Sequence, residues 1–327
     1  MKVLLTIDTE TYPLRSSWRG EGLRDDIKRD VYGVTCEREL GLRYLVRVLK
    51  EHRLKGVFFT EPLFTEITGL APLEEMVREI QRAGHEVAAH PHPAWLAWAG
   101  EAPFCDRGPQ AMPDFSPAEQ AEIIRRGVAR LREAGARDVC AFRASDGAAT
   151  RATLRALPAL GIRYDASYNA CLPASSLADV PELGGRNHPV WCEGVWALPL
   201  AVWHAPPTGL RPAQITEAPA ADLRNALLSA WRGGWSTFVL TTRSFGLLEN
   251  RRRRVYAPRP DWQGVQRFES LCCFLAEHRD EFETCGFADL DPTTLASAPA
   301  ARALRSPVHR TVARIIEQTY RSLTVTS

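Results

Sequence analysis

The chain has 327 residues, of which 45% are hydrophobic and 24% charged, proportions that are typical of a folded globular protein. Its formal net charge is +2, so no overall basic field favours binding to nucleic acid. No run of about 18 apolar residues predicts a membrane span, and the opening MKVLLTIDTE has too short an apolar stretch for a signal peptide. We therefore expect a cytoplasmic protein without a membrane span and without a nucleic-acid partner.

Eight cysteines are scattered along the chain, and no two of them form a CxxC pair. This spacing argues against a zinc ribbon, a thioredoxin-like redox motif or a disulfide framework. We predict that they are reduced thiols, because free cysteine behaves as a small buried hydrophobe.

Short apolar runs alternate with segments whose apolar residues have helical spacing. The first run, 3–7, reads as a buried strand that ends at acidic residues. A helix predicted from residue 117 has Ser116 as its N-cap and proline at its first position. In chain order we predict strand 3–7, an irregular polar stretch, helix 36–52, strand 56–60, helix 73–83, strand 84–90, helix 117–134, strand 139–143, helix 150–160, strand 162–165, apolar runs 195–202 and 237–241, and helix 267–279.

This alternation predicts a mainly parallel sheet with helices outside it. Six or more such strands favour closure, so we predict an α/β fold, a distorted (β/α) barrel of about seven parallel strands over residues 1–294. Residues 295–327 are predicted to form a linker and an amphipathic helix over 307–323. We expect this added C-terminal helix to dock on the barrel or on a second subunit of a homo-oligomer.

Four consecutive arginines, 251–254, precede two prolines and predict an exposed loop. We favour a solvated face here, and contact with an anion or phosphosugar is the alternative.

Polar residues sit repeatedly at the ends of the predicted strands, and the carboxyl ends of barrel strands form the active face. They are Asp8, Glu10, Thr60, His90, Arg143, Asp165 and Thr242. Two of these ends carry Asp8-Thr9-Glu10 and His90-Pro91-His92. A carboxylate and two imidazoles form a common zinc-type ligand set, so these residues are a candidate metal site. The pair is only moderately specific, because a lone HxH more often lies in a loop without binding a metal.

Seven segments carry a resemblance to a known family. They are TIDTE, GVFFT, GHEVAAHPHPAW, AFRASDG, GIRYDASY, VWALPL and FVLTTRSF. In this order, over roughly residues 1–290, they resemble the NodB-homology polysaccharide deacetylases of carbohydrate esterase family 4. The first motif is similar to that of an intracellular branch with Asp-x-Asp or Asp-x-Glu. The resemblance implies the barrel fold and a divalent metal, for which we expect zinc.

The resemblance also implies roles for the metal ligands. Glu10 matches the metal carboxylate, and if the family's adjacent spacing applied instead, Thr9 would take that place as a poor ligand. His90 matches the first histidine, whereas the second is expected at Ala94 and we assign its role to His92. Asp-x-Glu with HxH is then either a variant metal site or the metal-free arrangement of allantoinase-like relatives.

Three further residues match catalytic positions of the family. Asp8 matches the general base, and Arg143 matches the arginine that orients it. Arg243 stands where the family usually has a histidine that acts as general acid. Arginine does not deprotonate in proteins, so we expect Arg243 to stabilise an oxyanion or to bind an anionic substituent. His188 and His204 are the alternative proton donors.

The substrate pocket is expected to include Trp95, Asp165, Trp196 and Leu198. An exposed tryptophan stacks well on a sugar ring, although Trp95 and Trp98 fit a packing cluster equally well.

Three functions follow, and the first is favoured. It is the metal-dependent hydrolysis of an acetamido group on a small sugar or oligosaccharide substrate. The second is a metal-independent hydrolase of cyclic amides, and the third is a non-catalytic relative that binds a sugar or a partner.

Overall fold

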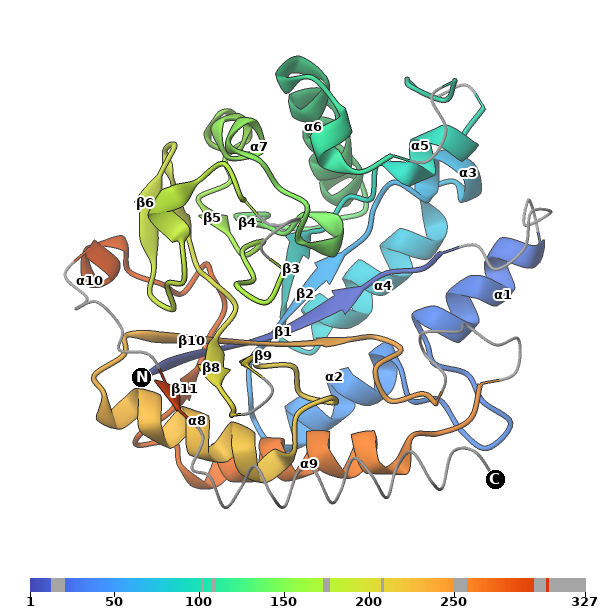
Figure 1. Ribbon diagram of the computed structural model, residues 1–327. Helices are drawn as coiled ribbons and strands as arrows, with labels where there is room; N and C mark the ends of the chain where they lie inside the picture. Colours follow the sequence, from blue (N-terminus) through green and yellow to red (C-terminus); the bar gives the residue numbers. More distant parts are fainter. Residues whose placement is uncertain are drawn as a thin grey trace.

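The computed structural model describes residues 1–12, 21–100, 103–106, 110–172, 177–206, 209–249, 258–296 and 304–305 (Figure 1). Its strands are β1 Lys2–Thr9, β2 Gly56–Thr60, β3 Glu86–Ala89, β4 Ala141–Phe142, β5 Tyr164–Asp165, β6 Val190–Cys192, β7 Val195–Ala197, β8 Val202–His204, β9 Leu210–Pro212, β10 Thr237–Arg243, β11 Glu283–Thr284 and β12 Leu304–Arg305. Its α-helices are α1 Glu21–Asp30, α2 Leu42–Glu51, α3 Thr65–Thr68, α4 Ala71–Arg82, α5 Ala94–Trp98, α6 Pro117–Glu133, α7 Arg151–Ala156, α8 Ala220–Arg232, α9 Trp262–Glu277 and α10 Pro292–Ala296. Four short 3₁₀ turns cover Met112–Asp114, Ser145–Gly147, Pro158–Leu160 and Pro181–Leu183.

The main sheet follows the order β10-β1-β2-β3-β4-β5-β7-β6, and β11 also pairs with β1. From β10 to β7 every neighbouring pair is parallel, and only β6 pairs antiparallel. The curled sheet confirms the predicted α/β barrel class with its parallel strands. Because βα units place helices outside, β2 is buried over its whole length, as a strand covered on both faces must be.

The gap between β7 and β10 is bridged by an irregular segment that follows β7. The N–H of Leu198 donates to Asp165 O and that of Leu200 to Tyr168 O, on the β5 side. The next amide, of Ala201, donates to Val239 O of β10. The run predicted over 195–202 is therefore two short strands, β7 and β8, that are separated by this bridge.

Helices cover the outer face of the sheet, with α8 and α9 side by side below β10 and β1 (Figure 1). Helix α6 approaches the loops that follow β2 and β3 very closely. A Cβ atom at Gly127 would lie 3.1 Å from Pro91 and 3.2 Å from Pro62, so glycine allows this contact. The helix thereby fixes the loop that carries His92.

Two helices of ten residues or more, α1 and α8, lie where the sequence patterns predicted none. Helix α1 falls in the stretch we expected to be irregular, and it is stabilised by the buried ion pair of Arg29 with Asp30, 2.8 Å apart, and by the pair of Arg29 with Asp26. Helix α8 buries Leu223, Ala226 and Leu227, whose helical spacing is visible in the sequence.

Three other predictions concern the cysteines, membrane-spanning helices and the C-terminal part of the chain. All eight cysteines are free thiols, as expected. Among the helices that the structure describes, none has the length and apolar character needed to cross a membrane. The arginines 251–254 and the predicted helix over 307–323 lie outside the described residues, so the division after residue 294 stays a prediction.

Candidate active site

A cavity of about 360 Å³ lies at the carboxyl ends of the barrel strands. Asp8 and Glu10 come from the end of β1, His90 follows β3, Arg143 follows β4, and Arg243 ends β10. The side chains that line the cavity are those of Asp8, Glu10, His90, Arg143, Ala144, Asp146, Ala166, Ser167, Asn169, Leu172, Leu200, Gln214, Thr241, Thr242 and Arg243, with Gly147. The predicted catalytic residues are thus brought to one cavity.

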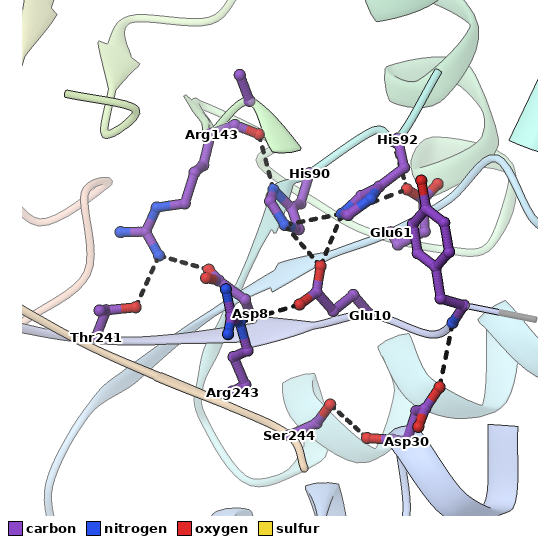
Figure 2. A network of polar contacts seen from close by, with 12 residues as sticks. Asp8, Glu10, Asp30, Glu61, His90, His92, Arg143, Thr241, Arg243 and Ser244 are labelled. Atoms are coloured by element: carbon purple, nitrogen blue, oxygen red, sulfur yellow. Dashed lines mark hydrogen bonds and ion pairs between the residues drawn. The ribbon is translucent and has the colours of Figure 1, made fainter. Parts of the chain in front are cut away.

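Three predicted metal ligands converge beside this cavity (Figure 2). Glu10 Oε2 lies 2.8 Å from His92 Nε2 and 3.5 Å from His90 Nε2, and the two Nε2 atoms are 3.1 Å apart. All three side chains are buried, and one donor atom from each lies within 4.8 Å of the others. A carboxylate oxygen and two imidazole nitrogens this close together require a proton or a cation between them.

Neighbouring backbone groups fix the orientation of both imidazoles. His90 Nδ1 lies 2.9 Å from Arg143 O, which can only accept, so Nδ1 carries a proton and Nε2 faces Glu10. Burial lowers the pKa of His90, but contacts with Glu10 and the charge of Asp8 outweigh it and raise that pKa. The backbone N–H of His92 donates to the buried carboxyl of Glu61, which also accepts from Leu63 N–H. Glu61 therefore fixes the loop of His92 by binding its backbone.

The ionisation of the cluster follows from its burial and its internal contacts. Burial alone would raise the pKa of Glu10, but contacts with His90 and His92 outweigh it and hold that pKa well below its usual range. Burial lowers the pKa of His92, so this ring is neutral and able to act as a ligand. The pKa of Glu61 is raised well above its usual range, chiefly by burial.

Asp8 and Arg143 form an ion pair next to this cluster. Arg143 Nη1 lies 2.5 Å from Asp8 Oδ1, and its other nitrogens donate to Ala166 O at 3.0 Å and to Thr6 Oγ1 at 2.9 Å. Since the guanidinium is also held by Ala166, just after β5, and by Thr6 of β1, it can orient the carboxylate of Asp8 in the cavity.

Arg243 reaches the carboxylate of Glu10 from the opposite side. Arg243 Nε lies 3.2 Å from Glu10 Oε1, whereas the imidazoles face Oε2. The side chain of Arg243 remains 41% exposed. Figure 2 shows Arg243 beside Asp8 and Glu10, so its positive charge lies next to both carboxylates.

The prediction that Trp95 forms a wall for the substrate is wrong, because its side chain is fully buried. Its ring packs 5.5 Å from that of Trp98 and 6.2 Å from that of Tyr12, and Tyr12 in turn contacts His92 at 5.5 Å. The packing alternative holds, and this aromatic cluster supports the loop of His92.

The other three predicted substrate residues also lie outside the cavity lining. Asp165 and Leu198 are buried, and Trp196 is half-buried against Trp191, 5.4 Å away on β6. The residues that line the cavity come one to four positions later, in the segments that follow β5 and β7: Ala166, Ser167, Asn169 and Leu200. The prediction placed the pocket at Asp165, Trp196 and Leu198, which lie just before these lining residues in the chain.

The alternative proton donors His188 and His204 are also absent from the cavity lining, and His204 is exposed on β8. Asp146 is a lining residue that the motif analysis did not single out. It has a φ of 52°, which aspartate tolerates, and the following glycine was the turn signal that marked this position.

The fold and the cavity together define an α/β-barrel protein with a buried carboxylate–imidazole cluster at the carboxyl ends of its strands. A family model described as polysaccharide deacetylase matches residues 38–164, which include His90, His92 and Arg143. This match confirms the resemblance given by the motifs over this part of the chain. No curated protein matches the chain.

Solved structures support the fold. A putative polysaccharide deacetylase from Mycobacterium smegmatis has a TM-score of 0.58 and 19% identity, with 94% of each chain covered. A 4-alpha-glucanotransferase from Thermococcus litoralis has a TM-score of 0.55 and 9% identity over 94% of this chain and 42% of that one. At these identities the likeness concerns the barrel fold alone.

Proposed function

We propose that the protein is a metal-dependent hydrolase that removes the acetyl group from an acetamido sugar or a short oligosaccharide. The observation that carries this proposal is the convergence of Glu10, His90 and His92 on one point beside the Asp8–Arg143 pair. The match of residues 38–164 to the polysaccharide deacetylase family model supports the substrate class.

The donor atoms fit a divalent metal. One carboxylate oxygen and two imidazole nitrogens of fixed orientation form a common zinc-type set, and the crowding of the two Nε2 atoms calls for a positive charge there. A metal held by these residues would supply Lewis acidity, which polarises an amide carbonyl and acidifies water.

Asp8 is the general base in this proposal. A positioned carboxylate that accepts the proton of an attacking water contributes about 10²–10⁴-fold to the rate. Arg143 holds the Asp8 carboxylate in place with an N–O distance of 2.5 Å. Arg243 is placed to stabilise negative charge that develops on the carbonyl oxygen, because fixed cations are most effective where charge appears.

The test is acetate release by the zinc- or cobalt-loaded protein, with N-acetylglucosamine and its short oligomers as probes. We expect turnover by the wild-type protein and loss of turnover in Glu10→Gln, with Asp138→Asn as the matched surface control. Asp138 is exposed, pairs with Arg163 at 3.3 Å and is not among the residues that line the cavity. Absence of acetate release from every probe would refute the proposal.

The Glu10–Arg243 ion pair favours one alternative, a hydrolase of the same fold that works without a metal. Here the guanidinium, 3.2 Å from Glu10 Oε1, already supplies a fixed positive charge. Activity on cyclic amides that survives chelators, together with no acetate release, would support this alternative.

A further inference from the structure

Cleavage of an amide requires a proton for the leaving nitrogen, and Arg243 occupies the position from which the family's histidine would give it. Asp8 accepts a proton in the proposed reaction and so is a base at that stage. Protonated Asp8 could return this proton to the amine, and a separate neutral donor that reaches the cavity would leave Asp8 to the activation of water alone.

Asp165, at the end of β5, is a buried carboxyl group that the proposed mechanism leaves unused. It is fully buried, and its two oxygens contact only Ser167 among the described residues. Oδ2 accepts from the backbone N–H of Ser167 at 3.1 Å, and Oδ1 lies 2.6 Å from Ser167 Oγ. Ser167 itself is one of the residues that line the cavity, so it lies between the buried acid and the site.

We propose that Asp165 is the proton source for the leaving amine and that the Ser167 hydroxyl passes the proton on. This inference rests on the proposed deacetylase function. When Asp165 is protonated, its O–H donates to Ser167 Oγ, which also accepts from Ala144 N–H at 2.9 Å. With both of these bonds accepted, the Ser167 hydroxyl donates its own proton toward the cavity.

The proton transfers balance with the cleavage. As the C–N bond breaks, the amine nitrogen takes the Ser167 hydroxyl proton, and the Asp165 carboxyl proton moves to Ser167 Oγ. Asp165 is left as a carboxylate and regains a proton from solvent through Ser167 before the next turnover. The proton that Asp8 removes from water leaves separately, so no further reactant is required.

The surroundings of Asp165 suit this role. Burial raises its pKa to about 6, although the hydrogen bonds from Ser167 oppose the rise. The charged or titratable groups that face it are Arg143, which favours the carboxylate, and the Cys192 thiol, which is neutral because burial raises its pKa to about 11. A general acid works best when its pKa lies near the working pH.

The decisive experiment compares two probes of different leaving group, N-acetylglucosamine and 4-nitrophenyl acetate. The first must expel an amine that needs a proton, whereas the second expels a phenolate that does not. We expect Asp165→Asn and Ser167→Ala to lower kcat on N-acetylglucosamine by about 10²–10⁴-fold and to change kcat on the ester by less than about threefold. Wild-type kcat on the amide should fall above about pH 6. In both variants kcat should show no such fall with rising pH.

A second measurement does not depend on turnover. The infrared difference between wild type and Asp165→Asn should show one neutral carboxyl band at pH 5 that titrates near pH 6. Its absence at pH 5 would overturn the relay. So would equal wild-type and Asp165→Asn rates on N-acetylglucosamine, with the deacetylase function intact. No acetate release by wild type from either probe would instead remove the proposed function, and the relay with it.

Discussion

The two ends of β3 place buried carboxyl groups in opposite environments. At the amino end, Glu86 accepts hydrogen bonds from Phe287 N–H at 3.2 Å and Ala288 N–H at 3.0 Å. Burial raises the pKa of Glu86 to about 7. At the carboxyl end, His90 meets Glu10, whose pKa is held well below its usual range by the two imidazoles although burial opposes this.

The difference shows that burial alone does not make a reactive site. Both carboxyl groups are desolvated, but Glu10 directly contacts groups that can carry positive charge, His90, His92 and Arg243. Glu86 is bound by backbone N–H groups, and the charge of Lys55 has a smaller effect on its pKa than burial has. Glu86 serves the architecture, because it joins β3 to the segment after β11. A Cβ atom at Gly286 would lie 2.1 Å from Glu86 Oε2, so a larger residue there would displace the Glu86 carboxyl group from its backbone partners.

The largest expected effect belongs to Asp8 at the carboxyl end. Asp8→Asn keeps the shape of the side chain but cannot accept a proton from water. We expect kcat for acetate release to fall by about 10²–10⁴-fold, with metal binding unchanged. Steady-state kinetics beside a metal titration measure both quantities, and an unchanged kcat would remove Asp8 from the proposed chemistry.

At the amino end of β3, we predict that substitution of Glu86 changes the stability of the protein and not its activity. Since the folded pKa of Glu86 is about 7 against an ordinary 4.5, its neutral form favours folding at low pH. That contribution, about 3 kcal/mol, is lost as the pH rises from about 4.5 through about 7. In Glu86→Gln the free energy of unfolding should change less with pH over this range, as measured by urea unfolding at a series of pH values. Parallel profiles for the two proteins would contradict the assignment.

The smallest expected effect concerns Arg243, whose guanidinium already forms an ion pair with Glu10. Arg243→Gln removes a positive charge 3.2 Å from Glu10 Oε1 that competes with a divalent ion. We expect the metal affinity to rise by about tenfold, the lower end of the usual effect of groups around a ligand. Calorimetric titration with zinc measures it, with Arg243→Lys as the charge-preserving control. Weaker binding in Arg243→Gln would mean that the guanidinium orients Glu10 more than it competes.

Much of this barrel could be predicted from the sequence. Apolar runs such as 3–7 and 56–60 give strands because parallel strands are buried on both faces, and their polar ends meet at one edge. Glu10 and His90 were found in this way, from two strand ends that are far apart in the chain.

The pocket walls were not predicted, because they lie in irregular segments that have no hydrophobic period. Ser167 and Asn169 follow β5 and Leu200 follows β7, so no pattern of strands or helices identifies them. Trp95 was misread for a related reason, since an aromatic residue beside a histidine fits both a sugar platform and a packing cluster. Only the three-dimensional contacts with Trp98 and Tyr12 decide between these.

The most direct test of the account is a cobalt titration of the metal-free protein, prepared without a histidine tag. We predict one ion per chain, with binding lost in Glu10→Gln and in the double variant His90→Ala/His92→Ala. The control His204→Ala should bind like wild type, because His204 is exposed on β8 and outside the cavity lining. No binding by wild type, or binding that survives in both site variants, would contradict the central claim that these three residues form a metal site.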